Sequence, residues 1–326
     1  MSKQRVVVIT GASSGIGRAT ALRFAARHDA VVLASRRAEA LRDLAAECVA
    51  LGGAAVAVPT DVADWLQVQR LAAAAVYEFG RIDVWINDAA ISVFAPLAEV
   101  PLDEFRRVLD VDVMGYVHGA KAALEVMIPQ GSGTLINVAS IVGEVPQPYT
   151  AAYSMSKAAV RAMGVSLRSE LALQKAKDVH VVTVLPPTVD TPFFGHAANH
   201  TGRRILAMPP VYSVDKVAAA IVHAADAPRN EIVIGRLGRA MVRQHRRTPT
   251  LMEAQMAVQV EATHLSPIEP APDTAGNLFA PPADAEATTT GGWGGRSRTA
   301  GRVALGGVLA AGLAAAVVLG ARARSA

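Results

Sequence analysis

The chain has 326 residues, of which 52% are hydrophobic, 18% are charged and 5% are aromatic, and its formal net charge is +4. This length exceeds one average domain, and the apolar share supplies a large core. The low aromatic content and the lack of a basic, aromatic-interleaved stretch argue against a nucleic-acid partner. Cys48 is the single cysteine, so an intrachain disulfide is excluded. Residues 1–5 lead into an apolar run without a signal peptide, which predicts that the folded domain stays in the cytoplasm.

The first elements are predicted to be a strand, a glycine-rich turn and a helix. The apolar run over 6–9 is typical of a buried strand, and residues 18–27 have the period of a helix with one apolar face. Residues 10–17 between them carry three glycines, in the spacing Gly-x-x-x-Gly-x-Gly. Such glycines let the turn close and let a backbone approach a pyrophosphate, and the helix N-terminus offers free N–H groups. Taken alone, the turn fits either a nucleotide site or an ordinary strand-to-helix connection.

Strand and helix patterns alternate after this unit, with short connections between them. The predicted strands are 30–34, 54–58, 82–87, 134–138, 179–185 and 231–234, and the predicted helices are 38–51, 64–79, 102–127, 151–174 and 215–227. Together with the first strand this makes seven strands. The alternation predicts an α/β fold, in which a single Rossmann-type doubly wound parallel sheet forms a domain over residues 1–238.

Three segments of different character follow that domain. Residues 239–265 are predicted to form a basic helical extension, and residues 266–302 a linker rich in Pro, Ala and Gly. Residues 303–320 contain no charged or strongly polar residue, which predicts a transmembrane helix at the lower limit of length. A disordered tail and a helix packed on the domain are the alternatives. We therefore expect a membrane-associated protein whose catalytic domain faces the cytoplasm.

Tyr153 and Lys157 lie four residues apart at the start of a predicted helix, so their side chains share one face. A neighbouring ammonium lowers the pKa of a phenol, which makes tyrosine a usable acid or base near neutral pH. Ser140 follows the predicted strand 134–138, at the sheet edge where the glycine-rich turn also lies. Each feature alone is common on helix surfaces and in turns. Their joint occurrence in this order predicts a site where Ser140 binds a carbonyl oxygen that Tyr153 protonates.

These motifs resemble the short-chain dehydrogenase/reductase family over about residues 4–235. The matching pieces are the TGxxxGxG turn from Thr10 to Gly17, Asp61-Val62, Asn87-Asp88-Ala89-Ala90, Ser140, Tyr153-x-x-x-Lys157 and the run from Pro186 to Thr191. The resemblance implies an NAD(P)-dependent oxidoreductase that transfers a hydride between the nicotinamide and a carbonyl carbon. Within the family, the two long helices 102–127 and 151–174 form dimers or tetramers, which implies a homo-oligomer here.

The resemblance also implies a role for each matching residue. Tyr153 would be the general acid in carbonyl reduction or the base in alcohol oxidation, and Ser140 would hold the substrate oxygen. Lys157 would bind the nicotinamide ribose and lower the pKa of Tyr153, with Asp112 at the position of the family's relay asparagine. The positions implied to contact the cofactor are Gly11, Ser13, Ser14, Gly15, Ile16, Gly17, Ser35, Arg36, Arg37, Asp61, Val62, Asn87, Ala89, Tyr153, Lys157, Pro186, Thr188 and Thr191.

Three positions depart from the family pattern. Ala90 replaces a glycine near the cofactor, where its methyl group should be tolerated. Asp112 serves if the relay uses its backbone carbonyl and a water, whereas turnover suffers if the side-chain amide is needed. Pro187 replaces a glycine and stiffens the turn above the nicotinamide.

The end of the second predicted strand determines the expected choice of cofactor. An acidic residue there would bind the ribose 2′-hydroxyl of NAD and repel a 2′-phosphate. This chain has Ser35, Arg36 and Arg37 instead, with Arg18 beside the turn. A hydroxyl and several cations favour a phosphate. We therefore expect NADP to be preferred, with NAD as the alternative.

The expected substrate is a small hydrophobic ketone, aldehyde or secondary alcohol, because the segments predicted to wall its site, 91–96, 142–149 and 192–212, are mostly apolar. No metal is expected, since His196 and His200 have neither a third ligand nor an acidic partner nearby in the sequence. Two other functions stay open. One is a non-catalytic NADP-binding membrane module, and the other is an epimerase or dehydratase that keeps its cofactor bound.

Overall fold

Seven parallel strands form one sheet in the computed structural model, which describes residues 4–281 and 287–294. The strands are β1 (Val6–Thr10), β2 (Ala30–Ser35), β3 (Ala54–Pro59), β4 (Val84–Asn87), β6 (Gly133–Val138), β7 (Val179–Leu185) and β10 (Glu231–Val233). Their order across the sheet is β10-β7-β6-β4-β1-β2-β3. The order reverses at β1, which is the topological switch of a doubly wound fold. The predicted α/β sheet is therefore confirmed.

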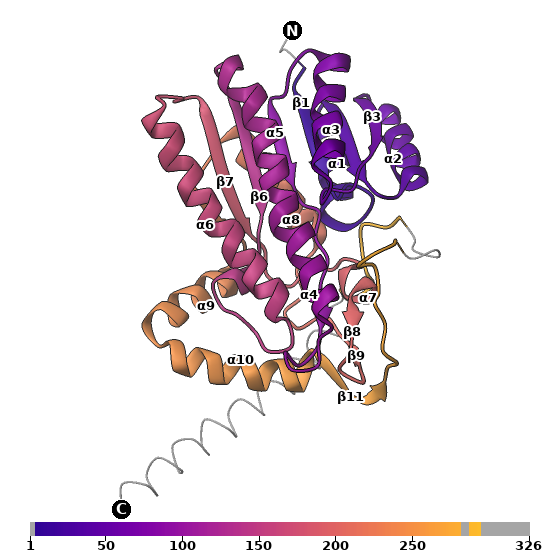
Figure 1. Cartoon of the computed structure of the whole chain (residues 1–326), viewed down its shortest axis with the longest axis vertical. Helices are drawn as coiled ribbons and strands as arrows, with labels where there is room; N and C mark the ends of the chain where they lie inside the picture. Colours follow the sequence, from indigo (N-terminus) through magenta and orange to yellow (C-terminus); the bar gives the residue numbers. More distant parts are fainter. Residues whose placement is uncertain (1–3, 282–286, 295–326) are drawn as a thin grey trace, which may run out of the picture.

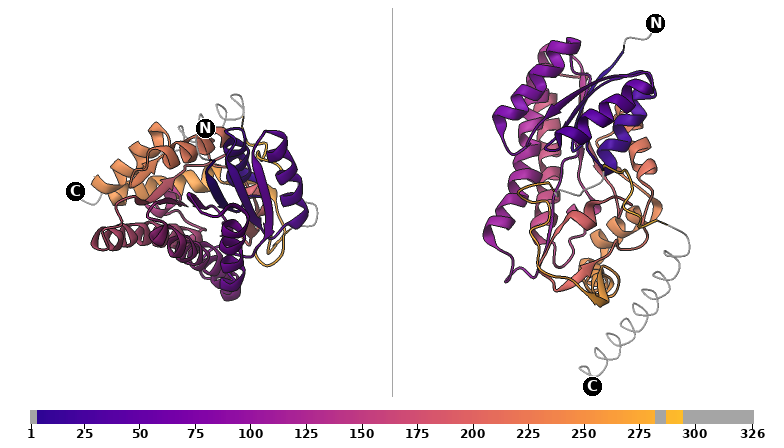
Figure 2. Two further views of the ribbon diagram at one scale, coloured as in Figure 1. Left: turned by 90° about the horizontal axis from the view of Figure 1, so that it is seen from above. Right: turned by 90° about the vertical axis from the view of Figure 1, so that its right-hand side faces the viewer.

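Helices cover both faces of the sheet (Figure 2). One face is covered by α3 (Trp65–Phe79), α4 (Leu102–Leu109), α5 (Gly115–Gln130) and α6 (Ala151–Leu173), and the other by α1 (Gly15–Ala25), α2 (Ala38–Ala50) and α8 (Val214–Asp226). Successive side chains of a strand point to opposite faces. In β1, Val6 and Val8 join one apolar cluster, whereas Val7 and Ile9 join the other. This two-sided burial explains the continuous apolar runs of the central strands.

The predicted helix 102–127 is interrupted in its middle. A π-helical turn over Asp110–Met114 separates α4 from α5. Such turns widen the helix locally and are frequent at functional sites. The turn carries Asp112, which is fully buried and accepts a hydrogen bond from the backbone N–H of Ile91 at 2.9 Å. Sequence periodicity does not reveal this interruption, because the apolar face continues through it.

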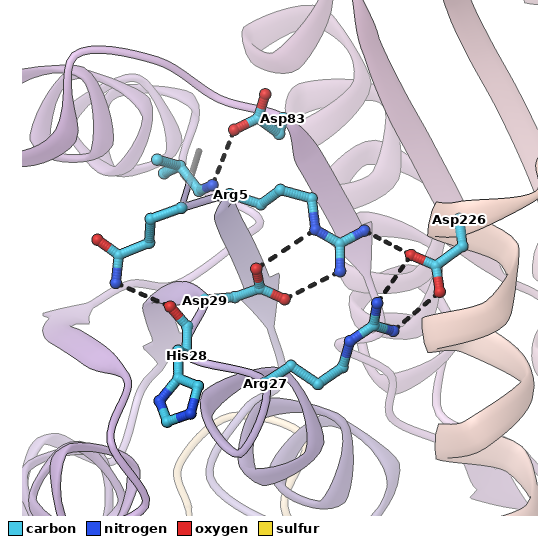
Figure 3. A network of polar contacts seen from close by, with 8 residues as sticks. Arg5, Arg27, His28, Asp29, Asp83 and Asp226 are labelled. Atoms are coloured by element: carbon cyan, nitrogen blue, oxygen red, sulfur yellow. Dashed lines mark hydrogen bonds and ion pairs between the residues drawn. The ribbon is translucent and has the colours of Figure 1, made fainter. Parts of the chain in front are cut away.

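A polar network ties the amino-terminal end of β1 to its surroundings, at the opposite end of the sheet from the site described below (Figure 3). Arg5 donates to Asp29 at 2.9 Å and to Asp226, at the end of α8, at 2.7 Å. Arg27 also donates to Asp226, at 2.8 Å. Although burial acts to raise the pKa of Asp226, the hydrogen bonds from Arg27 and Arg5 lower it overall. The network fixes α1 and α8 relative to the sheet.

A second layer gathers at the carboxyl ends of the strands (Figure 1). It contains α7 (Phe193–His196), α9 (Arg236–Arg247), α10 (Pro249–Thr263) and two small sheets, which pair β5 (Val93–Phe94) with β8 (Ala198–Asn199) and β9 (Arg203–Ile205) with β11 (Leu265–Pro270). The basic helical extension is thus two helices rather than one. The break falls at Thr248, because Pro249 starts α10 and cannot donate a backbone hydrogen bond to the preceding helix.

The described part of the segment predicted as a linker is ordered against the domain. It begins with β11, which pairs antiparallel with β9, and continues along the site as residues 271–281 and 287–294, which we call the C-terminal strap. Its backbone polar groups bond to distant parts of the chain, a feature that its Pro- and Gly-rich composition does not display. No helix in the described ranges has the length and apolar character needed to cross a membrane. The predicted transmembrane stretch 303–320 lies outside those ranges.

Candidate active site

The predicted site residues meet in one cavity at the carboxyl ends of the central strands. Parallel strands place the residues that follow them at a common edge, which is why motifs far apart in sequence converge there. All but two of the predicted cofactor positions and all but one of the predicted catalytic residues line this cavity; they are Gly11, Ser13, Ser14, Gly15, Ile16, Ser35, Arg36, Arg37, Asp61, Val62, Ala89, Pro186, Thr188, Thr191, Ser140, Tyr153 and Lys157. The remaining three positions, Gly17, Asn87 and Asp112, lie behind its wall.

Ser140 and Tyr153 both line the cavity, and their side chains are hydrogen-bonded to each other. Ser140 follows β6, and its hydroxyl accepts a hydrogen bond from the backbone N–H of Val142 at 3.3 Å. Burial, followed by the negative charge of Asp112, raises the pKa of Tyr153 well above its ordinary value, whereas a hydrogen bond with Ser140 lowers it. The phenol is therefore held in its protonated form. A protonated phenol beside a serine hydroxyl is suited to donate a proton to a carbonyl oxygen.

Lys157 is 1% exposed and lies beneath Tyr153 on α6. Its ammonium nitrogen is 3.1 Å from the hydroxyl of Tyr116 and 3.4 Å from the carbonyl oxygen of Val138. The same nitrogen is 5.3 Å from the centre of the Tyr153 ring. Burial lowers the pKa of Lys157, and the carboxylates of Asp112 and Asp88 act in the opposite direction. The lysine is thus held by polar partners directly under the tyrosine. The prediction that Lys157 lowers the pKa of Tyr153 is wrong for this structure, because burial raises the pKa of the phenol.

Asp112 contacts the wall of the site through Lys157 and through the backbone of Ile91. Its Oδ2 lies 3.5 Å from the lysine Nζ, and neither side chain is more than 1% exposed. Burial raises the pKa of the Asp112 carboxyl to about 6, although Lys157 acts to lower it. Asp112 does not line the cavity. It is a positioning residue for the lysine, and the geometry gives its side chain no direct contact with the reacting atoms.

Asp88 adds a second carboxyl, for which no role was predicted from the sequence. It lines the cavity and is hydrogen-bonded to the backbone of Gly17. Burial raises the pKa of Asp88 to about 8, with the charge of Lys157 and the Gly17 bond acting to lower it. Asp112 thus contacts Lys157 directly, and Asp88 acts on the same lysine through its charge.

Sequence reasoning missed Tyr116. Its hydroxyl accepts from Lys157 and donates to the carbonyl oxygen of Val138 at 2.8 Å, and the side chain is 1% exposed. Burial raises the pKa of Tyr116, as do the nearby carboxyls of Asp88 and Asp112. The available signal is its place one helical turn after Asp112, which puts both side chains on the same side of the π-helical turn.

The glycine-rich turn fits a dinucleotide pyrophosphate. Gly11 has φ +71° and Gly15 has φ +55°, which L side chains rarely adopt, and a Cβ at Gly11 would lie 2.8 Å from the backbone of Ala89. Gly17 is used differently, since a Cβ there would lie 2.5 Å from the carbonyl oxygen of Gly11. It lets α1 pack against the turn and does not line the cavity. The N-terminus of α1 thus lines the cavity with N–H groups of the kind that bind an anion.

Two arginines follow β2 at the adenosine end of the cavity. Arg37 donates from Nε to the hydroxyl of Ser13 at 3.2 Å and from Nη2 to the Ser13 carbonyl oxygen at 3.0 Å. Arg36 donates from Nη1 to the carbonyl oxygen of Leu278 at 3.1 Å and from Nη2 to that of Asn277 at 2.6 Å. Burial lowers the pKa of both guanidiniums from a high ordinary value. These charges fit a phosphate on the adenosine ribose.

Asp61 and Asn87 have structural partners that the sequence did not reveal. The Oδ2 of Asp61 forms an ion pair with Arg107 at 2.6 Å. Asn87 is 1% exposed; its amide donates to Asn137 at 2.9 Å and accepts from Trp85 at 2.8 Å. Asn87 therefore joins β4 to its neighbour β6, consistent with a role in steadying the central strand.

The substrate side of the cavity is largely apolar. Parts of all three segments predicted to wall the site line it, and α9 and α10 add residues from the extension that the sequence placed outside the domain. The apolar lining residues are Ile91, Phe94, Ile141, Val142, Val145, Phe193, Phe194, Met208, Leu237, Met241 and Met256. Among them, Phe193 packs against Tyr153, with 5.3 Å between the ring centres. Three of these residues are methionines, whose flexible side chains can adapt to substrates of different shape.

His196 and His200 have different surroundings, and the expectation that neither has an acidic partner is wrong for His200. His200 Nε2 lies 2.8 Å from the carboxylate of Glu104, and its Nδ1 lies 3.4 Å from Asp273. His196 lines the cavity, and burial lowers its pKa. Across the described parts of the chain, no group of three or more His, Cys, Asp or Glu side chains is arranged to hold a metal ion.

The chain is similar to known proteins of one family. The sequence model of the family described as short chain dehydrogenase matches residues 5–201. The oxidoreductase YxnA of Bacillus subtilis is 36% identical over 245 residues, covering 73% of this chain and 67% of its own. The oxidoreductase Lmo0432 of Listeria monocytogenes is 32% identical over 240 residues, covering 72% of this chain and 96% of its own.

Two solved structures share the fold. A short-chain dehydrogenase/reductase from Burkholderia phymatum in complex with NAD has a TM-score of 0.70 and 26% identity, covering 77% of this chain and 96% of its own. An alcohol dehydrogenase from Thermococcus sibiricus complexed with 5-hydroxy-NADP has a TM-score of 0.63 and 26% identity, covering 71% of this chain and 96% of its own. The family match, the two curated relatives and the arrangement of the cavity lead to one conclusion. The chain belongs to the short-chain dehydrogenase/reductase family of oxidoreductases.

Proposed function

We propose that this protein is an NADP-dependent oxidoreductase that interconverts a hydrophobic ketone or aldehyde and the corresponding alcohol. The observation that carries the proposal is the meeting of Ser140, Tyr153 and Lys157 in one cavity with two arginines after β2. When bound, NADPH supplies the hydride for the carbonyl carbon.

The residues of the cavity have separate roles in the reaction. Ser140 binds the carbonyl oxygen and orients the carbon toward the cofactor side of the cavity. Tyr153 donates its phenolic proton to that oxygen, and its protonated ground state, favoured by burial, is the form that this step needs. Lys157 stabilises the phenolate that remains. Asp112 holds Lys157, and the neighbouring carboxyls provide nearby groups from which the tyrosine is reprotonated.

The preference for NADP rests on charge. Arg36 and Arg37 lie at the adenosine end, and no carboxylate stands at the position that would bind a ribose 2′-hydroxyl. A 2′-phosphate carries charge that two guanidiniums complement, so it gains more from this site than a hydroxyl does. The two solved structures are compatible with either cofactor, since the one from Burkholderia phymatum is in complex with NAD and the one from Thermococcus sibiricus with 5-hydroxy-NADP.

The preference for a lipophilic substrate rests on the cavity wall. Aromatic, aliphatic and methionine side chains from α7, α9 and α10 surround the space beside Tyr153. Burying an apolar substrate there gains roughly 25 cal/mol for each Å² removed from water. A membrane anchor at 303–320 would place this cavity near a supply of such compounds. We propose that anchor from sequence alone.

A homo-oligomer formed through α5 and α6 is also part of the proposal. Both helices carry apolar side chains that the single chain leaves exposed; these are Met114, beside α5, Val117, Ile128, Met155, Val165 and Leu173. A stable dimer would bury such a surface. Sedimentation velocity of the detergent-solubilised protein measures the assembly, and a monomer at micromolar concentration would contradict it.

The proposed activity is tested by NADPH oxidation with a panel of hydrophobic ketones and aldehydes. We expect turnover with at least one member, faster with NADPH than with NADH. Tyr153→Phe keeps the ring packing and removes the proton donor, so its turnover should fall by about 10²- to 10⁴-fold with little change in NADPH affinity. Tight NADPH binding without turnover of any member, and identical behaviour of wild type and variant, would favour a non-catalytic binding module.

A further inference from the structure

The C-terminal strap contacts the groups that the proposed cofactor would need. At the pyrophosphate end, the backbone N–H of Gly15 donates to the carbonyl oxygen of Thr288 at 2.9 Å. Gly15 is the first residue of α1, so this N–H is one of the free donors of the helix N-terminus. The N–H groups at this terminus are the ones expected to bind a pyrophosphate. A strap carbonyl therefore occupies part of the anion site.

At the adenosine end, the strap engages the cations. Arg36 donates to the carbonyl oxygens of Asn277 and Leu278, and Arg107 donates to the same Leu278 oxygen at 3.0 Å. Arg107 is also the ion-pair partner of Asp61. The Leu278 side chain is fully buried in the apolar cluster that contains Val62. The buried Leu278 side chain therefore anchors the strap beside the cavity.

At the nicotinamide end, the strap is held by the loop after β7. The carboxylate of Asp190 accepts from the backbone N–H groups of Gly291 at 3.1 Å, Trp293 at 2.8 Å and Gly294 at 3.1 Å. The indole of Trp293 donates to the carbonyl oxygen of Thr191 at 3.1 Å and contacts the edge of Phe194. Thr191 is the residue expected to hold the nicotinamide carboxamide.

We propose that the C-terminal strap is an intramolecular competitor of the dinucleotide, so that NADPH binds only after the strap has left the cleft. The inference rests on the proposed function, because it concerns regulation of that same site. One N–H of Gly15 cannot be fully bonded to a strap carbonyl and to a phosphate oxygen at once, and the two guanidinium nitrogens of Arg36 that face the strap are likewise already used.

Competition of this kind has a simple quantitative form. If the cleft is open for only a fraction of the time, the apparent Kd for NADPH equals the intrinsic Kd divided by that fraction. Loosening the strap raises the open fraction and lowers the apparent Kd. A strap that instead closes over bound cofactor as a clamp would behave in the opposite way, because loosening it would raise the apparent Kd.

The first test uses the full chain with single substitutions in the strap. Trp293→Ala removes the indole hydrogen bond and the contact with Phe194, and Leu278→Ala weakens the buried anchor. Phe279→Ala is the matched control, since Phe279 adjoins the anchor but is 53% exposed. We expect the NADPH Kd, measured by fluorescence titration, to fall by about three- to tenfold in the first two variants and to stay unchanged in the control.

The second test uses the unmodified protein and needs no variant to fold. Hydrogen exchange of the backbone amides at 291–294 is compared with and without saturating NADPH. We expect faster exchange with NADPH, because the bonds to Asp190 open when the strap leaves. Slower exchange, or a Kd that rises in Trp293→Ala, would overturn competition in favour of a clamp.

The two proposals fail differently in these experiments. An NADPH Kd that is measurable and equal in the wild type and both strap variants overturns the competition and leaves the proposed function in place. Absence of NADPH binding in the wild type and in the Leu278→Ala and Trp293→Ala variants overturns the proposed function, and the competition with it.

Discussion

The carboxyl of Asp88 should make the stability of this protein depend on pH, and Asp88→Asn should remove that dependence. The pKa of Asp88 is raised from its ordinary 3.8 to about 8, chiefly by burial. The protonated form is therefore favoured in the folded protein relative to the unfolded chain. The stability that this proton confers is fully present below about pH 4 and is lost as the pH rises toward 8. Asparagine is close in shape, keeps an acceptor for the Gly17 backbone and carries no charge at any pH.

The size of the effect follows from linkage. One pH unit within this window changes the free energy of unfolding by at most about 1.4 kcal/mol, so the change between about pH 5 and about pH 7.5 is at most about 3 kcal/mol. Two features reduce this value: Asp88 lines the cavity and is only partly buried, and Lys157 favours the charged carboxylate. We expect the advantage of Asp88→Asn over the wild type to grow by about 1–3 kcal/mol across that interval, or several degrees in Tm.

Thermal unfolding of both proteins, without cofactor and at matched ionic strength, measures this difference directly. Glu99→Gln is a suitable control, because Glu99 lies in an exposed turn and a change there should leave the pH dependence as it is in the wild type. Parallel curves for the wild type and Asp88→Asn, with the same gap in Tm at both pH values, would refute the conclusion that burial holds Asp88 protonated.

Two further predictions concern other parts of the molecule. Arg36→Ala should raise the Kd for NADPH by about 10- to 100-fold relative to the Kd for NADH, because one charge-assisted contact with the 2′-phosphate is lost. The ratio of the two Kd values cancels any effect of the substitution on the strap. An unchanged ratio in paired titrations would contradict the cofactor assignment. Arg5→Ala leaves the Asp29 carboxylate, 8% exposed, without its guanidinium partner and should lower the free energy of unfolding by about 2–4 kcal/mol in urea titrations. A loss below about 0.5 kcal/mol would show that the network in Figure 3 contributes nothing beyond a surface ion pair.

The sheet and the main catalytic set could be predicted from the sequence because local signals carry them. Each central strand is an apolar run of a few residues between turn signals, and Tyr153 and Lys157 are placed together by helical spacing alone. Ser140 joins them because the carboxyl ends of parallel strands share one edge. These inferences need no knowledge of distant contacts.

The features that the sequence did not predict all depend on distant partners. The π-helical turn at Asp110–Met114 leaves the apolar pattern unbroken, and the raised pKa of Asp88 comes from burial that no local motif encodes. The strap is the clearest case, since its Pro- and Gly-rich composition is that of a linker. Its order comes from bonds to Arg36 and Asp190, more than 80 residues away in the chain, and from one buried leucine.

The measurement that tests the central claim most directly follows a labelled hydride. NADPH carrying deuterium at the transferring position of the nicotinamide is incubated with the protein and with a ketone that it turns over, and the alcohol is analysed by mass spectrometry. The account predicts deuterium on the carbinol carbon in the wild type and almost no labelled alcohol with Tyr153→Phe. Deuterium that stays in the cofactor while product forms, or labelled alcohol made equally fast by the variant, would contradict it.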